Sequence, residues 1–192
     1  RALFWLADVS TLEPLRDKVG LSQTRYPYTG GSMLSPDIFR FLRAIGLNLK
    51  QMYGASEVPL VSCQPDGDIK FESSGPPLPN LELRISKDNE MLLRGPNICQ
   101  GYYKNPEATK AKIVDGWFHS ADAGSVDEDG HLIFLSRVAD LMELAGGEKF
   151  SPEYIEGQLK FSPYIRDAVV LGGKDKAYVS CLVQVDYDIV GK

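Results

Sequence analysis

The chain has 192 residues, of which 43% are hydrophobic and 24% charged, so its composition is that of an ordinary globular protein with one large domain, or one domain and part of another. A net charge of −5 argues against a broad basic face for nucleic acid, and we expect no nucleic-acid partner. No apolar run approaches the length of a membrane span.

The cysteines indicate the redox compartment of the protein, and the first residue indicates that the sequence is part of a longer chain. Cys63, Cys99 and Cys181 are scattered without a CxxC spacing or a nearby histidine pattern. This argues against a disulfide framework and against a zinc site, and it predicts reduced thiols in a cytoplasmic protein. The chain begins with Arg1 and shows no signal peptide, so we expect a piece of a longer protein.

The first predicted elements are a helix and a strand. Residues 10–13 form a Ser-x-x-Glu capping box, which predicts a short helix that begins there and runs toward Val19. Residues 25–29 then predict a strand that runs into the pair Gly30 and Gly31.

A second helix and strand follow. Ser-Pro-Asp at residues 35–37 predicts the start of a helix that Gly46 ends, and residues 47–53 predict the next strand. The order of elements over residues 22–57 is that of an α/β sheet. The predicted apolar face of the helix is formed by Ile38, Phe41, Leu42 and Ile45.

After Val58 the pattern changes to short strands separated by turns, which predicts a small, mostly antiparallel sheet or barrel. Trp117 and Phe118 are both expected in its core. The expected elements are a loop at 73–80, strands at 81–85 and 90–95, a helix at 105–113, and strands on either side of a Asp-Glu-Asp-Gly hairpin at 127–130.

The last part of the chain, which begins near residue 137, has a third pattern. Residues 141–144 resemble a strand, a Gly-Gly turn follows at 146–147, and Ser-Pro-Glu at 151–153 starts a helix. Two further strands follow within residues 167–185. We expect a domain boundary between residues 136 and 140.

Two stretches place glycine at the end of a predicted α/β strand, where such sheets bind ligands: residues 28–31 and 53–57. Glycine lets a ligand approach the backbone closely. Tyr53 offers a flat face for a heterocycle, Ser56 a hydroxyl for a phosphate, and Glu57 a hard oxygen for Mg²⁺. The spacing alone equally allows two ordinary surface turns.

Asp122 is a single carboxylate at the predicted end of an apolar strand. It can accept two hydroxyls, as acids do for ribose, and Arg137 can add a fork of donors. A turn acid and a solvated arginine are the alternative. The His-Ser-Ala-Asp run at 119–122 does not predict a serine hydrolase, because neighbours on a strand point to opposite faces and no GxSxG elbow is present.

Three ordered motifs resemble the adenylate-forming, or AMP-binding, superfamily of acyl-CoA synthetases, luciferases and peptide-synthetase adenylation domains. YGASE resembles Tyr-Gly-x-Thr-Glu, GWFHSAD resembles Gly-Trp-Phe-x-Thr-Gly-Asp, and SRVADLMELAGGEKFSPEYIE resembles the Arg…Gly-Gly…Pro…Glu motif. The resemblance covers nearly the whole chain. Phrases such as YTGGSMLSPDIFRFLRAIG are most similar to bacterial long-chain fatty-acid–CoA ligases.

The resemblance implies roles for the residues singled out above. Asp122 would hold the ribose hydroxyls of ATP and of the acyl-adenylate, Tyr53 would stack on adenine, and Arg137 would also reach the ribose. Ser56 would contact the α-phosphate and Glu57 would bind Mg²⁺, which makes these two the implied catalytic residues. The implied nucleotide-binding set is Gly30, Gly31, Tyr53, Gly54, Ser56, Asp122 and Arg137.

The implied reaction has two steps. A fatty acid attacks the α-phosphate of ATP and releases pyrophosphate, and the thiol of CoA then displaces AMP. A rotation of the C-terminal domain would let one site serve both half-reactions, and the Gly-Gly loop at 146–147 would line the pantetheine path. ATP, Mg²⁺ and CoA are therefore the implied cofactor and co-substrates.

The implied fold combines α/β and α+β parts. Residues 1–59 would be an α/β piece of the large N-terminal domain, residues 60–136 its β-rich subdomain, and residues 137–192 the start of the mobile, small C-terminal domain. The family's phosphate-binding loop would lie before Arg1 and its terminal lysine beyond Lys192, so we expect the 192 residues alone to be inactive.

Two alternative functions remain open at this stage. The acid could be another one, aryl or medium-chain, or the chain could be a non-catalytic nucleotide-binding module, as Ala121 and Ala139 at altered motif positions suggest. The oligomeric state is also open. A cytoplasmic location is expected, with peripheral contact to the inner membrane as an alternative because a long-chain acid partitions into bilayers.

Overall fold

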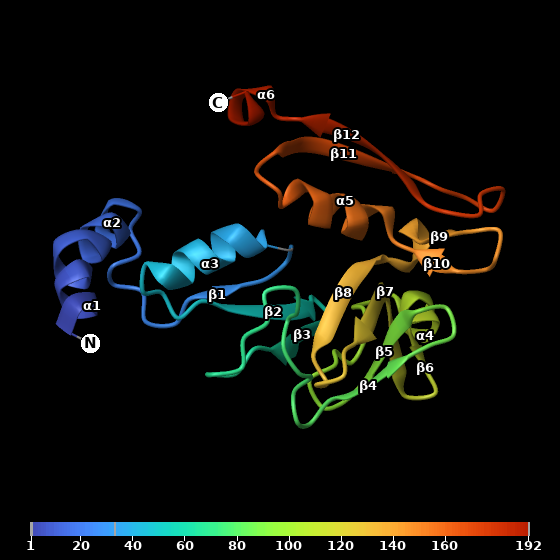
Figure 1. Cartoon of the computed structure of the whole chain (residues 1–192). Helices are drawn as coiled ribbons and strands as arrows, with labels where there is room; N and C mark the ends of the chain where they lie inside the picture. Colours follow the sequence, from blue (N-terminus) through green and yellow to red (C-terminus); the bar gives the residue numbers. More distant parts are fainter. Residues whose placement is uncertain (1, 33, 192) are drawn as a thin grey trace.

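The computed structural model describes residues 2–32 and 34–191 and arranges them as several small sheets with helices between them (Figure 1). The helical segments are α1 (Ala2–Ala7), the π-helical turn η1 (Asp8–Leu12), α2 (Glu13–Lys18), α3 (Pro36–Ala44), α4 (Pro106–Lys112), the 3-10 helix η2 (Val138–Asp140), α5 (Pro152–Lys160) and α6 (Tyr187–Val190). The strands are β1 (Tyr28–Thr29), β2 (Lys50–Ala55), β3 (Val58–Cys63), β4 (Glu82–Ile85), β5 (Glu90–Arg94), β6 (Ile113–Val114), β7 (Trp117–Val126), β8 (Leu132–Arg137), β9 (Met142–Glu143), β10 (Lys149–Phe150), β11 (Ile165–Leu171) and β12 (Ser180–Val185).

The N-terminal helices form one uninterrupted helical stretch, α1–η1–α2, which lies to one side of the sheets in Figure 1. The predicted capping box at residues 10–13 was wrong. Ser10 lies inside the π-helical turn, and its hydroxyl contacts that of Thr11 at 3.3 Å. Because helix already precedes Ser10, the free N–H groups that a cap would satisfy are not there. The predicted helix end at Val19 is confirmed.

Strands β1 and β2 pair in parallel and are connected through α3, which confirms the predicted α/β order (Figure 1). Two strand predictions were incomplete: β1 is shorter than residues 25–29, and β3 was not predicted. The α3 bounds are as expected, but its buried aromatic is Phe39, whose ring meets that of Phe71 edge-on with 5.4 Å between centroids. Ile38 and Phe41, predicted on the buried face, are half exposed.

The main sheet is antiparallel with the strand order β4-β5-β7-β6, and β8 pairs with the second half of β7. This confirms the predicted antiparallel sheet. Trp117 was predicted in the core, but it is only partly buried, and the guanidinium groups of Arg84 and Arg94 lie 4.3 and 4.6 Å from its ring centroid. The buried core cluster is Val58, Val61, Leu81, Met91, Leu93, Phe118 and Leu132.

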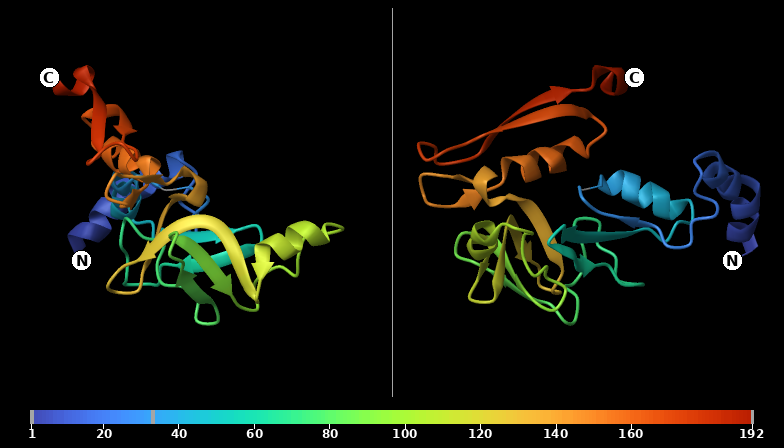
Figure 2. Two further views of the ribbon diagram at one scale, coloured as in Figure 1. Left: turned by 90° about the vertical axis from the view of Figure 1, so that its right-hand side faces the viewer. Right: turned by 180° about the vertical axis from the view of Figure 1, so that it is seen from behind.

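The C-terminal part places α5 between the hairpin β11–β12 and the rest of the chain (Figures 1 and 2). Ser151 caps α5 by accepting a hydrogen bond from the Tyr154 N–H at 3.0 Å, and its hydroxyl donates to the Leu135 carbonyl of β8 at 3.1 Å. The Lys149 ammonium lies 2.7 Å from the Asp88 carboxylate in the β4–β5 turn. These contacts connect α5 to the main sheet. No helix in the described ranges is long and apolar enough to cross a membrane.

Gly75 lies in the loop before β4, where its carbonyl accepts a hydrogen bond from the Leu132 N–H of β8 at 2.9 Å. Its Cα packs against the end of β3 and leaves no room for a side chain. Its φ is +85°, and a Cβ would lie 2.4 Å from backbone atoms of Cys63 and Gln64, whereas Gly67 has a φ of +82° with no atom within 4 Å. We expect Gly67→Ala to lower the free energy of unfolding by about 1–2 kcal/mol through backbone strain alone. Gly75→Ala should cost about 3 kcal/mol or more, because the backbone must also move. Urea unfolding measures both, and equal losses would contradict the crowding argument.

Candidate functional site

A cavity of about 910 Å³ opens where β2, β7, β8 and α5 meet. Its size is near the upper end of ordinary ligand pockets. Seven of the eight predicted site residues line it: Gly31, Tyr53, Gly54, Ser56, Glu57, Asp122 and Arg137. The eighth, Gly30, is not among the lining residues, although a Cβ there would lie 3.0 Å from the carbonyl oxygen of Met52, which does line the cavity. Residues that the sequence places far apart therefore share one pocket.

The Asp122 carboxylate is buried at one wall of this cavity, with only 4% of the residue exposed. The Tyr53 hydroxyl donates a hydrogen bond to Oδ2, and Nη1 of Arg137 lies 2.6 Å from Oδ1. The pairing of β7 with β8 places Asp122 directly opposite Arg137. The arginine contact is an ion pair without hydrogen-bond alignment, so Oδ1 accepts no hydrogen bond from the described residues. Oδ1 is shielded from solvent and lies against the Arg137 guanidinium, so a ligand hydroxyl reaches the carboxylate only when one of its two partners gives way.

The Tyr53 ring forms part of the same wall. It stacks on Phe134 of β8 with 5.7 Å between centroids and 27° between planes. Burial, and then the hydrogen bond to Asp122, raise the pKa of Tyr53 far above its usual value. The phenol therefore stays neutral and remains a donor at every physiological pH.

The backbone around Asp122 differs from the prediction. Asp122 was expected at a strand end, but β7 continues past it to Val126, and the acid lies at an irregularity in the strand. The preceding Ala121 has a φ of +61°, a conformation that residues with a Cβ seldom adopt. Ser120 accepts a hydrogen bond from the Asp122 N–H at 3.0 Å and donates to the Met91 carbonyl at 2.7 Å. Its hydroxyl is thus used within the strand pair.

The stretch at residues 53–57 also folds differently from the expected glycine turn. Gly54 lies inside β2, and the turn is formed by Ser56 and Glu57. Glycine is required there because a Cβ would lie 2.3 Å from the carbonyl oxygen of Pro59 on the antiparallel partner strand. The turn leaves the Ser56 side chain exposed at the cavity.

Glu57 carries the carboxylate that the sequence predicted for a metal ion. It accepts a hydrogen bond from the Tyr102 hydroxyl at 2.6 Å, and this bond is the main reason why its pKa lies below the ordinary value. The same bond raises the pKa of Tyr102 to about 12. The described residues contain no group of three or more His, Cys, Asp or Glu side chains that could hold a metal on its own. Glu57 is thus a single ionised carboxylate at the cavity, and its predicted role with Mg²⁺ would require most of the metal ligands to come from phosphates and water.

Sequence reasoning missed several lining residues. Lys112 reaches the cavity from the end of α4, and its ammonium donates to the His119 carbonyl at 3.2 Å. Glu153 and Tyr154 come from α5. Glu153 and Tyr154 lie in a motif that the sequence identified, but only the packing of α4 and α5 beside β7 and β8 shows that they and Lys112 reach the pocket. Tyr102 was not predicted either, because its bond to Glu57 joins residues 45 positions apart.

Comparison with known proteins decides the family. The model of the family described as AMP-binding enzyme matches residues 5–103, which is slightly more than half of the chain. The chain belongs to the AMP-binding enzyme family. This confirms the resemblance that the motifs suggested, and the matched region includes the glycine pair and the β2–β3 turn of the cavity.

Two kinds of curated relative are similar to this AMP-binding chain. The long-chain-fatty-acid–CoA ligase FadD15 of Mycobacterium bovis is 35% identical over 187 residues, which cover 97% of this chain and 31% of the relative. The 2-succinylbenzoate–CoA ligase of Bacillus cytotoxicus is 34% identical over 179 residues, which cover 87% of this chain and 37% of the relative. The chain thus spans about a third of the length of these relatives.

Solved structures agree with the predicted fold class. The amide bond synthetase McbA from Marinactinospora thermotolerans superposes with a TM-score of 0.73 and 27% identity, covering 90% of this AMP-binding chain and 39% of McbA. The O-succinylbenzoate coenzyme A synthetase of Bacillus subtilis, solved in complex with AMP, gives a TM-score of 0.67 and 26% identity over 91% of this chain and 39% of its own. The fold is therefore that of part of an adenylate-forming enzyme.

Tyr102→Phe should raise the pKa of Glu57 toward its ordinary value, because it removes the hydrogen bond that favours the ionised carboxylate. A carboxyl with a depressed folded-state pKa adds stability above its unfolded pKa, and this stability is lost as pH falls through the folded pKa. The variant should therefore be less stable than wild type at pH 7, and the difference should vanish in acid.

A carbon-13 titration of the glutamate carboxyls measures the pKa, and chemical unfolding at several pH values measures the stability. Tyr103→Phe is the matched control, because the neighbouring Tyr103 is 89% exposed. An unchanged Glu57 titration in Tyr102→Phe would contradict the assignment.

Proposed function

We propose that this chain is part of an ATP-dependent acid–thiol ligase that converts a long-chain fatty acid into an acyl-adenylate and then into an acyl-CoA thioester. The Asp122 carboxylate carries the proposal. It is buried at the cavity wall and is held there by Tyr53 and Arg137. A carboxylate with this geometry suits the vicinal hydroxyls of a ribose. Membership of the AMP-binding enzyme family supports an adenylate as the ligand.

The remaining nucleotide roles follow from the positions of side chains around Asp122. We assign the Tyr53 ring to the adenine base, since it presents a flat aromatic face beside the proposed ribose position. The backbone near Gly30 and Gly31 is assigned to the same end of the nucleotide. The exposed Ser56 hydroxyl, in the turn after β2, is assigned to the α-phosphate.

Glu57 is the residue that would hold Mg²⁺, together with phosphate oxygens. Its depressed pKa keeps the carboxylate ionised, and it lines the same cavity as Ser56. When bound, the ion would neutralise charge on the phosphates during attack by the fatty-acid carboxylate. Lys112 and Arg137 lie at the same cavity and add positive charge near Glu57. These protein groups would hold the nucleotide in line with the acid and favour the developing negative charge.

The C-terminal part of the chain is assigned to the second half-reaction. Helix α5 supplies Glu153, Tyr154 and Gly157 to the cavity, so a movement of this part changes the surroundings of the adenylate. The Gly-Gly turn at 146–147 is proposed to line the path of the CoA pantetheine. The domain limits at residues 59 and 136 and the inactivity of the 192 residues alone stay predictions.

The fatty acid is proposed from the similarity to FadD15 over 97% of this chain. A similar level of identity to 2-succinylbenzoate–CoA ligases makes an aromatic acid the second candidate. We propose a cytoplasmic location, with contact to the inner membrane where the enzyme collects its acid. The acyl pocket itself is assigned no residues.

ATP–pyrophosphate exchange by the protein that contains this chain tests the proposal. We would offer acetate, octanoate, palmitate, benzoate and 2-succinylbenzoate. Palmitate-dependent exchange is expected, and Asp122→Ala should reduce it by roughly a hundredfold, because hydrogen bonds to a charged acceptor are lost. Glu128→Ala is the control, since Glu128 lies exposed in the β7–β8 hairpin.

Each other outcome has a separate meaning. Exchange that requires another acid would keep the adenylation chemistry and overturn the fatty-acid assignment. Full exchange in Asp122→Ala would overturn the ribose assignment. A folded wild-type protein that binds ATP but exchanges with no acid would be a nucleotide-binding module without ligase activity.

A further inference from the structure

The stretch of β7 that carries Asp122 is longer than the strand it pairs with. His119 pairs with Leu92 and Ala123 with Glu90, so three residues of β7 lie opposite the single residue Met91 of β5. Two residues of β7 are therefore extra, and the backbone must leave the plane of the sheet to accommodate them. This departure brings the Asp122 carboxylate to the cavity wall.

The carboxylate of Glu90 contacts this irregular stretch of β7 at two residues, Ala121 and His119. Its Oε1 accepts a hydrogen bond from the Ala121 N–H at 2.9 Å, and its Oε2 lies 3.0 Å from Nδ1 of His119. The backbone carbonyls of the residues on either side of Glu90 add two contacts. The Met91 carbonyl accepts from the Ser120 hydroxyl at 2.7 Å, and the Asn89 carbonyl accepts from the Gly124 N–H at 3.1 Å. Glu90 is the only side chain of β5 among these four contacts.

The contact to Ala121 falls at a non-glycine residue with a positive φ. A residue with a Cβ at a φ of +61° is disfavoured, and it keeps this conformation only when its surroundings hold it. The Glu90 side chain is 19% exposed, so its hydrogen bond to the Ala121 N–H is partly shielded from water and correspondingly strong. Because Ala121 directly precedes Asp122, a change in its φ would swing the carboxylate away from Tyr53 and Arg137.

We propose that Glu90 is a positioning residue for Asp122: its carboxylate holds Ala121 in the left-handed conformation that points Asp122 into the cavity. The proposal rests on the proposed function only in so far as Asp122 binds the ribose. Glu90 lines no part of the cavity, so it would act through the backbone of β7 and not by touching the nucleotide.

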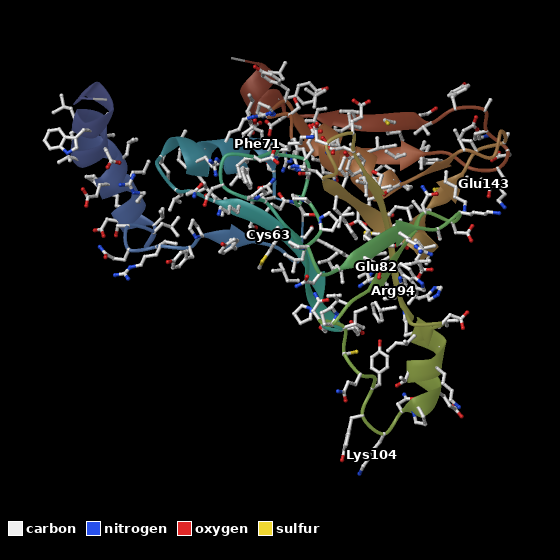
Figure 3. The ribbon with its side chains drawn as sticks, turned by 90° about the horizontal axis from the view of Figure 1, so that it is seen from below. Cys63, Phe71, Glu82, Arg94, Lys104 and Glu143 are labelled. Atoms are coloured by element: carbon white, nitrogen blue, oxygen red, sulfur yellow. The ribbon has the colours of Figure 1, made fainter. Side chains whose placement is uncertain are left out.

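AMP binding, measured by titration calorimetry, tests the effect on the site. Glu90→Ala should weaken AMP binding about tenfold, because a charged hydrogen bond to the backbone is lost. Glu90→Gln keeps an acceptor oxygen for the Ala121 N–H and should stay within about threefold of wild type. Glu82→Ala is the matched control, since it removes a neighbouring surface carboxylate that pairs with Arg94 on the same sheet (Figure 3).

A second substitution separates this role from general stabilisation of the sheet. Glycine adopts a positive φ without strain, so Ala121→Gly removes the need for Glu90. In the Ala121→Gly background, Glu90→Ala should weaken AMP binding by no more than about threefold. Equal losses in both backgrounds, or an equal loss in Glu82→Ala, would overturn the proposal.

The nuclear magnetic resonance signal of the Ala121 amide gives a readout that needs no nucleotide. A proton shared with a carboxylate resonates downfield and exchanges slowly, and both properties should be lost in Glu90→Ala and kept in Glu90→Gln. An unchanged amide in Glu90→Ala would overturn the positioning role. Absence of AMP binding by the wild-type protein would overturn the proposed function instead, and the amide signal would still decide the role of Glu90.

Discussion

The structure around the cavity depends on the burial of one charged carboxylate. An unpaired carboxylate in a protein interior costs several kcal/mol, so Asp122 can be buried only if other groups compensate its charge. Arg137 does so from the facing strand and Tyr53 from β2. The single acid thus links the five-stranded sheet to the α/β unit, two parts of the fold that otherwise have separate strand pairings. The removal of either partner would leave a buried charge and would loosen this connection.

The same residues form the pocket and hold the fold together at that point. Tyr53 packs on Phe134, while Arg137 lies at the end of β8, directly before the 3-10 turn that leads to the C-terminal strands and α5. A movement of the C-terminal part therefore acts first on the arginine that pairs with Asp122. Ser151 and Lys149 add contacts from this part to β8 and to the β4–β5 turn. The shape of the cavity therefore depends on where the C-terminal part of the chain lies.

Local sequence signals predicted most elements, because proline at the first helical position, asparagine or serine caps and glycine turns act over a few residues. The bounds of α3, α4 and α5 follow such signals. The failures came from longer-range effects. Trp117 is only partly buried, with its ring against two arginines of β4 and β5. Ser10 caps no helix, because helix already precedes it.

In the candidate site, too, local motifs were predicted and longer-range contacts were not. Motif resemblance identified Tyr53, Asp122 and Arg137, and the structure brings them into contact. Residue types alone could not show that Ala121 lies at a positive φ or that Glu90 reaches it, because both facts depend on how two strands of unequal length pair. Lys112 likewise reaches the pocket, and Tyr102 reaches Glu57, only through the packing of the segment around α4.

The hydrogen bond between Tyr53 and Asp122 also has a kinetic meaning. A ligand hydroxyl that takes the place of Tyr53 at Oδ2 displaces the tyrosine hydroxyl, so the protein contains its own competitor for that position. Part of the interaction energy of the ligand is consumed in this exchange, which lowers its net affinity and shortens its residence time. When the ligand leaves, the Tyr53 hydroxyl returns and again donates a hydrogen bond to the carboxylate. Such an arrangement favours release of the ligand over tight retention.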